Sequence, residues 1–155
     1  MLRMTLMRTS MLAVLAVAVL ARPAPAQPSV DKTVPFELGK WYELNVKEGP
    51  ITLHRVHLER PGGVPLKARV TGADDEYRVP VKVEVEYSNA SSTDWKATVR
   101  ISWLDERGDV IDGYNGTSEI DEKKDFDRIG GTVVTLKYGL AHARKLRLLI
   151  TVRPD

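Results

Sequence analysis

Strict alternation of apolar and polar residues is the feature of this sequence that most limits how the chain can fold. From Val79 to Tyr87 every second residue is apolar, and the residues between them are Pro80, Lys82, Glu84 and Glu86. The same pattern runs from Trp95 to Trp103. Successive side chains of an extended strand point to opposite faces. The pattern therefore predicts two strands, each with one buried and one solvated face.

Shorter alternating segments predict the remaining strands at 41–46, 51–59, 64–71, 109–114, 132–138 and 146–152. Glycine, proline and aspartate turns separate them, among them a hairpin turn at 105–108. We expect one helical turn within 139–145, and no segment has a long 3.6-residue repeat. The fold class that these patterns predict is all-β, an immunoglobulin- or fibronectin-like antiparallel β-sandwich of about 7–9 strands.

The first 26 residues have the pattern of a secretory signal. Arg3 and Arg8 precede an apolar run at 11–21, and Ala24-Pro25-Ala26 follows with the small residues of a peptidase site. The run has about 11 residues, whereas a spanning helix needs roughly 20, although an uncleaved anchor stays open as the alternative. We therefore expect a signal peptide at 1–26, a proline-rich tail at 27–35 and a single sandwich domain at 36–155. The mature protein would be periplasmic or extracellular, with no membrane span after cleavage.

The net charge limits the classes of partner, and the cysteine content determines whether disulfides can form. The formal net charge is +2, and loss of Arg3, Arg8 and Arg22 with the signal leaves 20 basic against 21 acidic side chains, a net charge of about −1. Nothing in this balance favours nucleic acid as a partner. The chain has no cysteine, so an exported form has no disulfides, a composition more typical of bacterial than of animal secreted proteins.

Candidate metal ligands are few. His54 and His57 are three residues apart, which in a regular strand places them on opposite faces. Acidic residues cluster at 105–112 and 121–127, but their spacing is not that of a calcium loop and basic residues interrupt them. We expect neither a metal nor another cofactor.

Catalytic motifs are missing from the sequence. It contains no nucleophile elbow, zinc-protease motif, P-loop or dinucleotide fingerprint. A hydrolase with an unmarked carboxylate pair stays open, because any sandwich carries many carboxylates. We expect a protein that is not an enzyme.

Aromatic side chains are the best candidates for ligand contact. Trp95 and Trp103 share the apolar face of their strand, so we expect both in the core. Trp41 and Tyr42 are adjacent, so one of them must point away from the core. The candidate ligand-binding residues, an exposed aromatic patch, are Trp41, Tyr42, Tyr77 and Tyr114.

Residues 79–126 resemble the FxLYD-type immunoglobulin-like domains of exported bacterial proteins. The segments that carry the resemblance are Asn89 with its small polar neighbours, Ile101-Ser102-Trp103-Leu104-Asp105, Gly108 with Val110-Ile111, and Phe126. The chain departs from the family where Ile101 replaces Phe and Trp103-Leu104 replaces Leu-Tyr. The resemblance implies a small sandwich domain with no catalytic residues to transfer.

These observations predict an exported, non-enzymatic domain acting in protein–protein interaction or in envelope structure. Its partner would be another envelope or secreted protein. The alternative is a carbohydrate-binding module that uses exposed aromatic residues, and an exposed aromatic row would distinguish it from a protein-binding module with a flat patch or open sheet edge.

Overall fold

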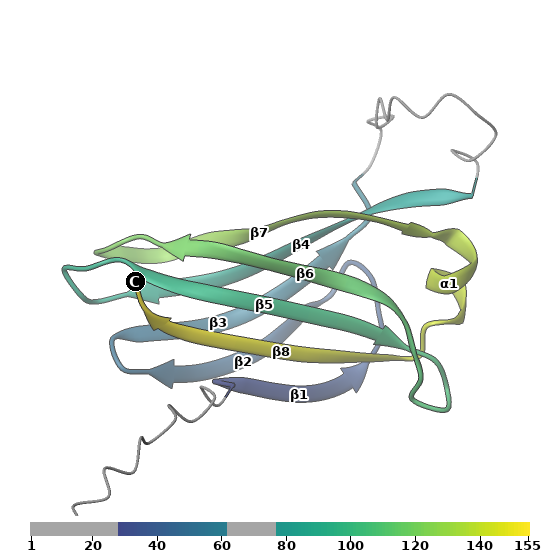
Figure 1. Cartoon of the computed structure of the whole chain (residues 1–155), viewed down its shortest axis with the longest axis horizontal. Coiled ribbons are helices and arrows are strands. Elements are labelled where there is room, and N and C mark those ends of the chain that lie inside the picture. The colour runs from purple at the N-terminus through teal and green to yellow at the C-terminus, as the bar shows by residue number, and fades with distance from the viewer. Residues whose placement is uncertain (1–27, 62–76) are drawn as a thin grey trace, which may run out of the picture.

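The computed structural model describes residues 28–61 and 77–155, and Figure 1 shows that they form two stacked layers of strands. The elements are β1 (Val30–Pro35), β2 (Trp41–Glu48), β3 (Ile51–Glu59), β4 (Arg78–Asn89), β5 (Trp95–Leu104), β6 (Val110–Ile120), β7 (Lys124–Leu136), α1 (Lys137–His142) and β8 (Lys145–Pro154). The expected signal peptide at 1–26 and strand at 64–71 lie outside these residues. No helix within the described ranges has the length and apolar character needed to cross a membrane.

The strands form two antiparallel four-stranded sheets. One sheet has the order β1-β8-β5-β6 and is called here the β5 sheet, while the other has the order β2-β3-β4-β7 and is called the β4 sheet. The predicted all-β antiparallel sandwich is confirmed, with eight strands in the described residues. The strand order does not single out the immunoglobulin family, whose constant-type domains pair their first two strands in one sheet. Here β1 and β2 belong to different sheets.

The interior consists of the apolar residues that alternation assigned to it. The odd-numbered residues from Val79 to Tyr87 are at most 2% exposed, and Val99, Ile101 and Trp103 are at most 1% exposed. Leu146, Leu148 and Ile150 of β8 are also fully buried, and in the same sheet they pair with Trp103, Ile101 and Val99 of β5. Trp95 is only half-buried and packs at the border of the core.

The N-terminal part of the domain differs from the prediction. Residues 27–35 were expected to be a tail, yet Val30–Pro35 form β1 and pair with β8 from Val30↔Ile150 to Pro35↔Lys145. Val30 is 5% exposed and belongs to the core. The prolines misled the prediction because Pro28 precedes the strand and Pro35 ends it, where a missing N–H costs no ladder hydrogen bond.

The charged segment before the predicted strand at 132–138 is also part of the sheet. β7 starts at Lys124, and its first half pairs with β4 through Asp127↔Tyr87 and Arg128↔Glu86. Within this segment Ile129 packs against the core, whereas Phe126 is 60% exposed. The helical turn expected within 139–145 is present slightly earlier, as α1.

Trp103 tests the assignment of faces. It is fully buried, so Trp103→Ala should lower the free energy of unfolding by about 3–5 kcal/mol through lost burial and a residual cavity. Arg100 on the same strand is exposed, and Arg100→Ala should change the free energy of unfolding by less than about 0.5 kcal/mol. Urea unfolding followed by circular dichroism measures both. Equal small losses would contradict the packing described here.

Gly108 tests the hairpin turn between β5 and β6. Its φ is +94°, as the predicted turn requires, and a Cβ there would meet nothing within 4 Å. Only backbone strain therefore opposes a side chain, and Gly108→Val should cost about 1–2 kcal/mol of unfolding free energy. The neighbouring Arg107→Ala should be nearly silent because it removes only a surface charge. Thermal melts of both variants measure the difference, and an unchanged melting temperature for Gly108→Val would contradict the turn geometry.

Candidate functional site

The outer surface of the β4 sheet carries a set of aromatic and charged side chains that contact one another. Six of them define what is called here the Trp41 face: Trp41, Arg55, His57, Glu84, Glu86 and Arg128. The strand register brings them together in two rows. One row runs from Trp41 through His57 to Glu84, and the other from Arg55 through Glu86 to Arg128.

A β-bulge in β3 sets which side chains reach this surface. The register between β3 and β4 shifts between Leu53 and Arg55. Leu53 and Val56 are fully buried, whereas His54 and Arg55 between them are both half-buried. An extra residue in one strand lets two successive side chains point the same way. The prediction that His54 and His57 lie on opposite faces is therefore wrong, because each contacts outward residues of the same sheet.

Trp41 is the aromatic centre of the face. The His57 ring stacks on it with ring centroids 4.6 Å apart and planes 16° apart. The guanidinium carbon of Arg55 lies 4.2 Å from the indole centroid, and that of Arg128 lies 5.1 Å from it. Both distances are within the range of cation–π attraction. Three neighbours from β3 and β7 thus hold the indole in place.

Glu86 holds the two arginines. Arg55 donates two hydrogen bonds to its carboxylate, from Nε at 2.9 Å and Nη2 at 3.1 Å. Arg128 Nη2 lies 3.5 Å from the same carboxylate, and Glu86 is only 4% exposed. The Arg55 hydrogen bonds hold the pKa of Glu86 below its usual range and raise the pKa of Arg55. Glu86 therefore stays ionised and fixes both guanidinium groups against the indole.

A cluster that overlaps the edge of the face has the composition of a metal site, which the sequence analysis did not identify. Ligand atoms of His57, Glu59 and Glu84 lie within 4.8 Å of one another. The ammonium of Lys82 already lies 3.0 Å from Glu84 and 3.6 Å from Glu59. Hydrogen bonding to Glu84 raises the pKa of Lys82 and keeps it charged. The protein's own cation occupies the position that a metal would need, so this cluster gives no support for a metal centre.

A second cluster at the end of the same surface joins a histidine, a serine and an aspartate. His54 Nε2 and Ser88 Oγ are 2.7 Å apart, and Ser88 Oγ donates to Asp125 at 2.7 Å while accepting from the Phe126 N–H at 3.2 Å. A nucleophilic triad places the histidine between the acid and the hydroxyl, whereas here the serine lies in the middle. These contacts fix the backbone of Phe126, whose φ is +50° and whose ring stacks on His54 at 4.4 Å.

The four aromatic candidates do not form one patch. Trp41 points outward, but Tyr42 is 6% exposed and belongs to the core. The single proton of the Tyr42 hydroxyl is shared between the carbonyls of Glu37 at 2.8 Å and Pro35 at 3.1 Å, and the hydroxyl accepts from the Glu37 N–H, which satisfies it inside the domain. Tyr114 is half-buried against the core, and Tyr77 is 63% exposed at the start of β4. The predicted exposed patch is therefore wrong as a group, and only Trp41 belongs to the site.

The stability that Glu86 contributes depends on pH, so the Arg55–Glu86 interaction can be measured. A carboxyl whose folded pKa is lowered stabilises the fold above its unfolded pKa of about 4.3, and this stability is lost as the pH falls through the folded pKa. Glu86→Gln should therefore be less stable than the wild type at pH 7, and the difference should shrink below about pH 4. Thermal melts from pH 7 to pH 3 measure it, with the exposed Glu119→Gln as the control. A difference that stays constant down to pH 3 would contradict the Arg55–Glu86 interaction.

The chain matches no family model, and neither a curated protein nor a solved structure matches it. The proposed function therefore rests on the arrangement of the side chains.

Proposed function

We propose that the chain is an exported, non-enzymatic binding domain whose Trp41 face contacts another envelope or secreted protein. The observation that carries the proposal is the contact of one half-buried indole with two arginines that a single buried carboxylate holds in place. The basic n-region, apolar run and Ala24-Pro25-Ala26 support export to the periplasm or the medium. The resemblance of residues 79–126 to FxLYD-type domains is part of the proposal and rests on the motifs in that segment.

The composition of the face favours a protein partner. Tryptophan and arginine are the residues most enriched among those that dominate binding energy at protein interfaces. Side chains that are already ordered lose less conformational entropy on binding. Here Glu86 and the indole restrain Arg55 and Arg128 before any partner arrives. The face is also part of a four-stranded sheet, which offers a rigid surface rather than a loop.

The same contacts weaken the carbohydrate alternative. A sugar stacks on an open aromatic face, but the His57 ring and the guanidinium groups of Arg55 and Arg128 already lie against the indole. Trp41 and Phe126 are anchored by different clusters, one at the β2–β3 pair and the other at the start of β7.

Quantitative affinity capture tests the proposal. Wild type, Trp41→Ala and Arg100→Ala would each be used to capture proteins from envelope extracts of the producing cells, with recovered proteins quantified by mass spectrometry. Arg100 is the matched control because it is exposed on the opposite, β5 sheet. A binding partner should be recovered with the wild type and Arg100→Ala and fall at least about tenfold with Trp41→Ala, the loss expected for an interface hot spot.

Two outcomes would decide against the proposal. Equal recovery of every protein with all three baits, at matched folded fractions from circular dichroism, would exclude the Trp41 face as the binding surface. A glycan array that binds the wild type and not Trp41→Ala would establish the carbohydrate module in its place.

A further inference from the structure

Phe126 is a bulky residue in a backbone conformation that bulky residues rarely adopt. Its φ is +50°, in the left-handed region that glycine and asparagine occupy most readily. Burial does not offset this cost, because the side chain is 60% exposed. Strained residues persist only where their surroundings hold them, and they concentrate at functional sites. The packing of the domain therefore does not explain why phenylalanine stands at this position.

Three residues hold Phe126 in this conformation. The Phe126 N–H donates to Ser88 Oγ at 3.2 Å, and Ser88 Oγ donates its only proton to Asp125 at 2.7 Å. His54 Nε2, 2.7 Å from the same oxygen, is therefore the donor in that contact. The imidazole held in this way stacks on the Phe126 ring, with centroids 4.4 Å apart and planes 18° apart. The ring is thus ordered before any partner binds, which lowers the entropy cost of a contact.

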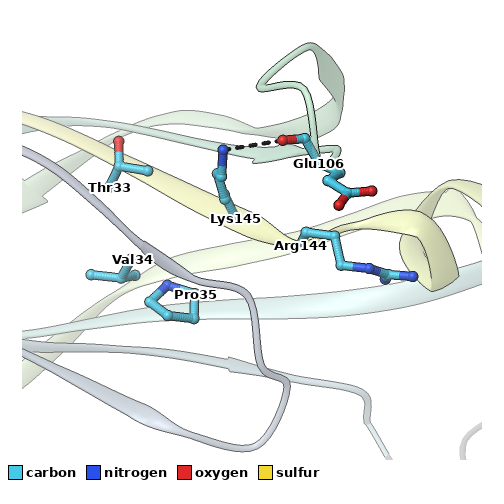
Figure 2. A pocket seen from close by; sticks show the side chains of 6 residues that line it. All are labelled: Thr33, Val34, Pro35, Glu106, Arg144 and Lys145. Atoms are coloured by element: carbon cyan, nitrogen blue, oxygen red, sulfur yellow. Dashed lines mark hydrogen bonds between the residues drawn. The ribbon is translucent and has the colours of Figure 1, made fainter.

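A groove at the other sheet lacks this kind of support. Its lining residues, of which only one is half-buried and the rest are exposed, are Thr33, Val34, Pro35, Glu106, Arg144 and Lys145. Lys145 donates to the carbonyl of Glu106, whereas Arg144 donates to the carbonyls of Ala141 and Ala143. Figure 2 shows that the two cations point apart, and none of the six lining residues has a positive φ. The groove therefore offers nothing comparable to the Phe126 cluster.

The Phe126 ring borders the Trp41 face. On β3 His54 directly precedes Arg55, and on β7 Phe126 lies two residues before Arg128. Trp41 and Phe126 belong to β2 and β7, the two edge strands of the β4 sheet. The surface that joins them crosses all four strands, a width of roughly 14 Å at about 4.8 Å per strand. Such a width fits a folded protein, since stable interfaces cover about 800 Å² on each partner.

Arg128 adds a positive charge beside the Phe126 ring. Its side chain is 48% exposed, and its guanidinium lies 3.5 Å from Glu86 and 3.9 Å from Glu84. Each of these carboxylates has a second cation closer to it, because Arg55 hydrogen-bonds to Glu86 and Lys82 lies 3.0 Å from Glu84. The charge of Arg128 is therefore only partly compensated within the domain and complements a carboxylate on a partner.

We propose that Phe126 is a second anchor of the partner-binding surface, and that the partner is a folded protein presenting an apolar side chain next to a carboxylate. The apolar side chain packs on the exposed part of the Phe126 ring, and the carboxylate pairs with Arg128. This inference rests on the proposed function, because it extends the Trp41 face across the whole β4 sheet. Binding affinity, rather than folding stability, then accounts for phenylalanine at this position.

Two substitutions separate stability from binding. Glycine adopts a positive φ without penalty, whereas alanine keeps the strain. Phe126→Gly should therefore melt about 2–5 °C above Phe126→Ala in thermal melts followed by circular dichroism. An equal or lower melting temperature for Phe126→Gly would remove the backbone cost on which the proposal depends and would overturn it.

Affinity capture measures the contact, with wild type, Trp41→Ala, Phe126→Gly and Val110→Thr as baits and bait-free resin as the blank. Val110 is the matched control because it is an exposed apolar residue, 68% exposed, on the β5 sheet. The protein lost with Trp41→Ala should also fall at least about tenfold with Phe126→Gly and remain with Val110→Thr.

The other capture outcomes separate this inference from the proposed function. Unchanged recovery with Phe126→Gly would overturn the Phe126 anchor and leave the Trp41 face as the binding surface. Loss with Phe126→Gly but not with Trp41→Ala would support the anchor and overturn the proposed role of Trp41. Recovery of no protein above the bait-free resin would overturn both.

Photo-crosslinking tests the chemistry of the partner. Phe126→p-benzoylphenylalanine keeps an aromatic ring at this position and forms covalent bonds to neighbouring C–H groups on irradiation. Mass spectrometry of the crosslinked peptide should identify an apolar residue next to an aspartate or glutamate on the captured protein. A crosslinked site without an acidic neighbour, or equal crosslinking from Val110→p-benzoylphenylalanine, would overturn the proposed partner chemistry.

Discussion

Burial of one apolar face of each sheet against the other is the interaction on which this domain depends. The chain has no cysteine, so no disulfide shares that role. Trp103, Tyr87 and the fully buried leucines and isoleucines fill the space between the sheets, and each such side chain contributes roughly 1.5–3 kcal/mol by leaving water. Because the buried faces provide this stabilisation, the outer faces of the sheets can carry charged and aromatic groups.

The Trp41 face shows how a local irregularity creates a surface that regular alternation would not. Without the bulge before Arg55, that side chain would point into the core together with its charge, at a prohibitive desolvation cost. The bulge turns Arg55 outward beside Glu86, and Phe126 adopts a left-handed backbone in the neighbouring irregularity of β7. A non-glycine residue in this conformation costs about 1–2 kcal/mol. Both of these irregularities lie on the β4 sheet.

The sequence was sufficient to predict a strand wherever one strand face is apolar and the other polar. The strands around Val83 and Val99 were predicted close to their observed bounds for this reason. Alternation gave no signal where burial is partial. β1 buries mainly Val30, and the first half of β7 is charged at nearly every position, so neither segment shows a period of two. The Arg55–Glu86–Arg128 contacts were not predictable, because a bulge leaves no mark in residue type and the three residues are far apart in sequence.

The position of β8 sets the order in which the domain can assemble. β8 lies between β1 and β5, so the strand at 30–35 has no neighbour in its sheet until residues 145–154 have been synthesised. During translation β1 therefore stays unpaired until a segment more than 100 residues later in the chain has been synthesised. Sheets closed by such distant pairings fold slowly, typically in milliseconds to seconds. The emerging chain consequently remains open to factors that act on extended polypeptides until β8 has left the ribosome.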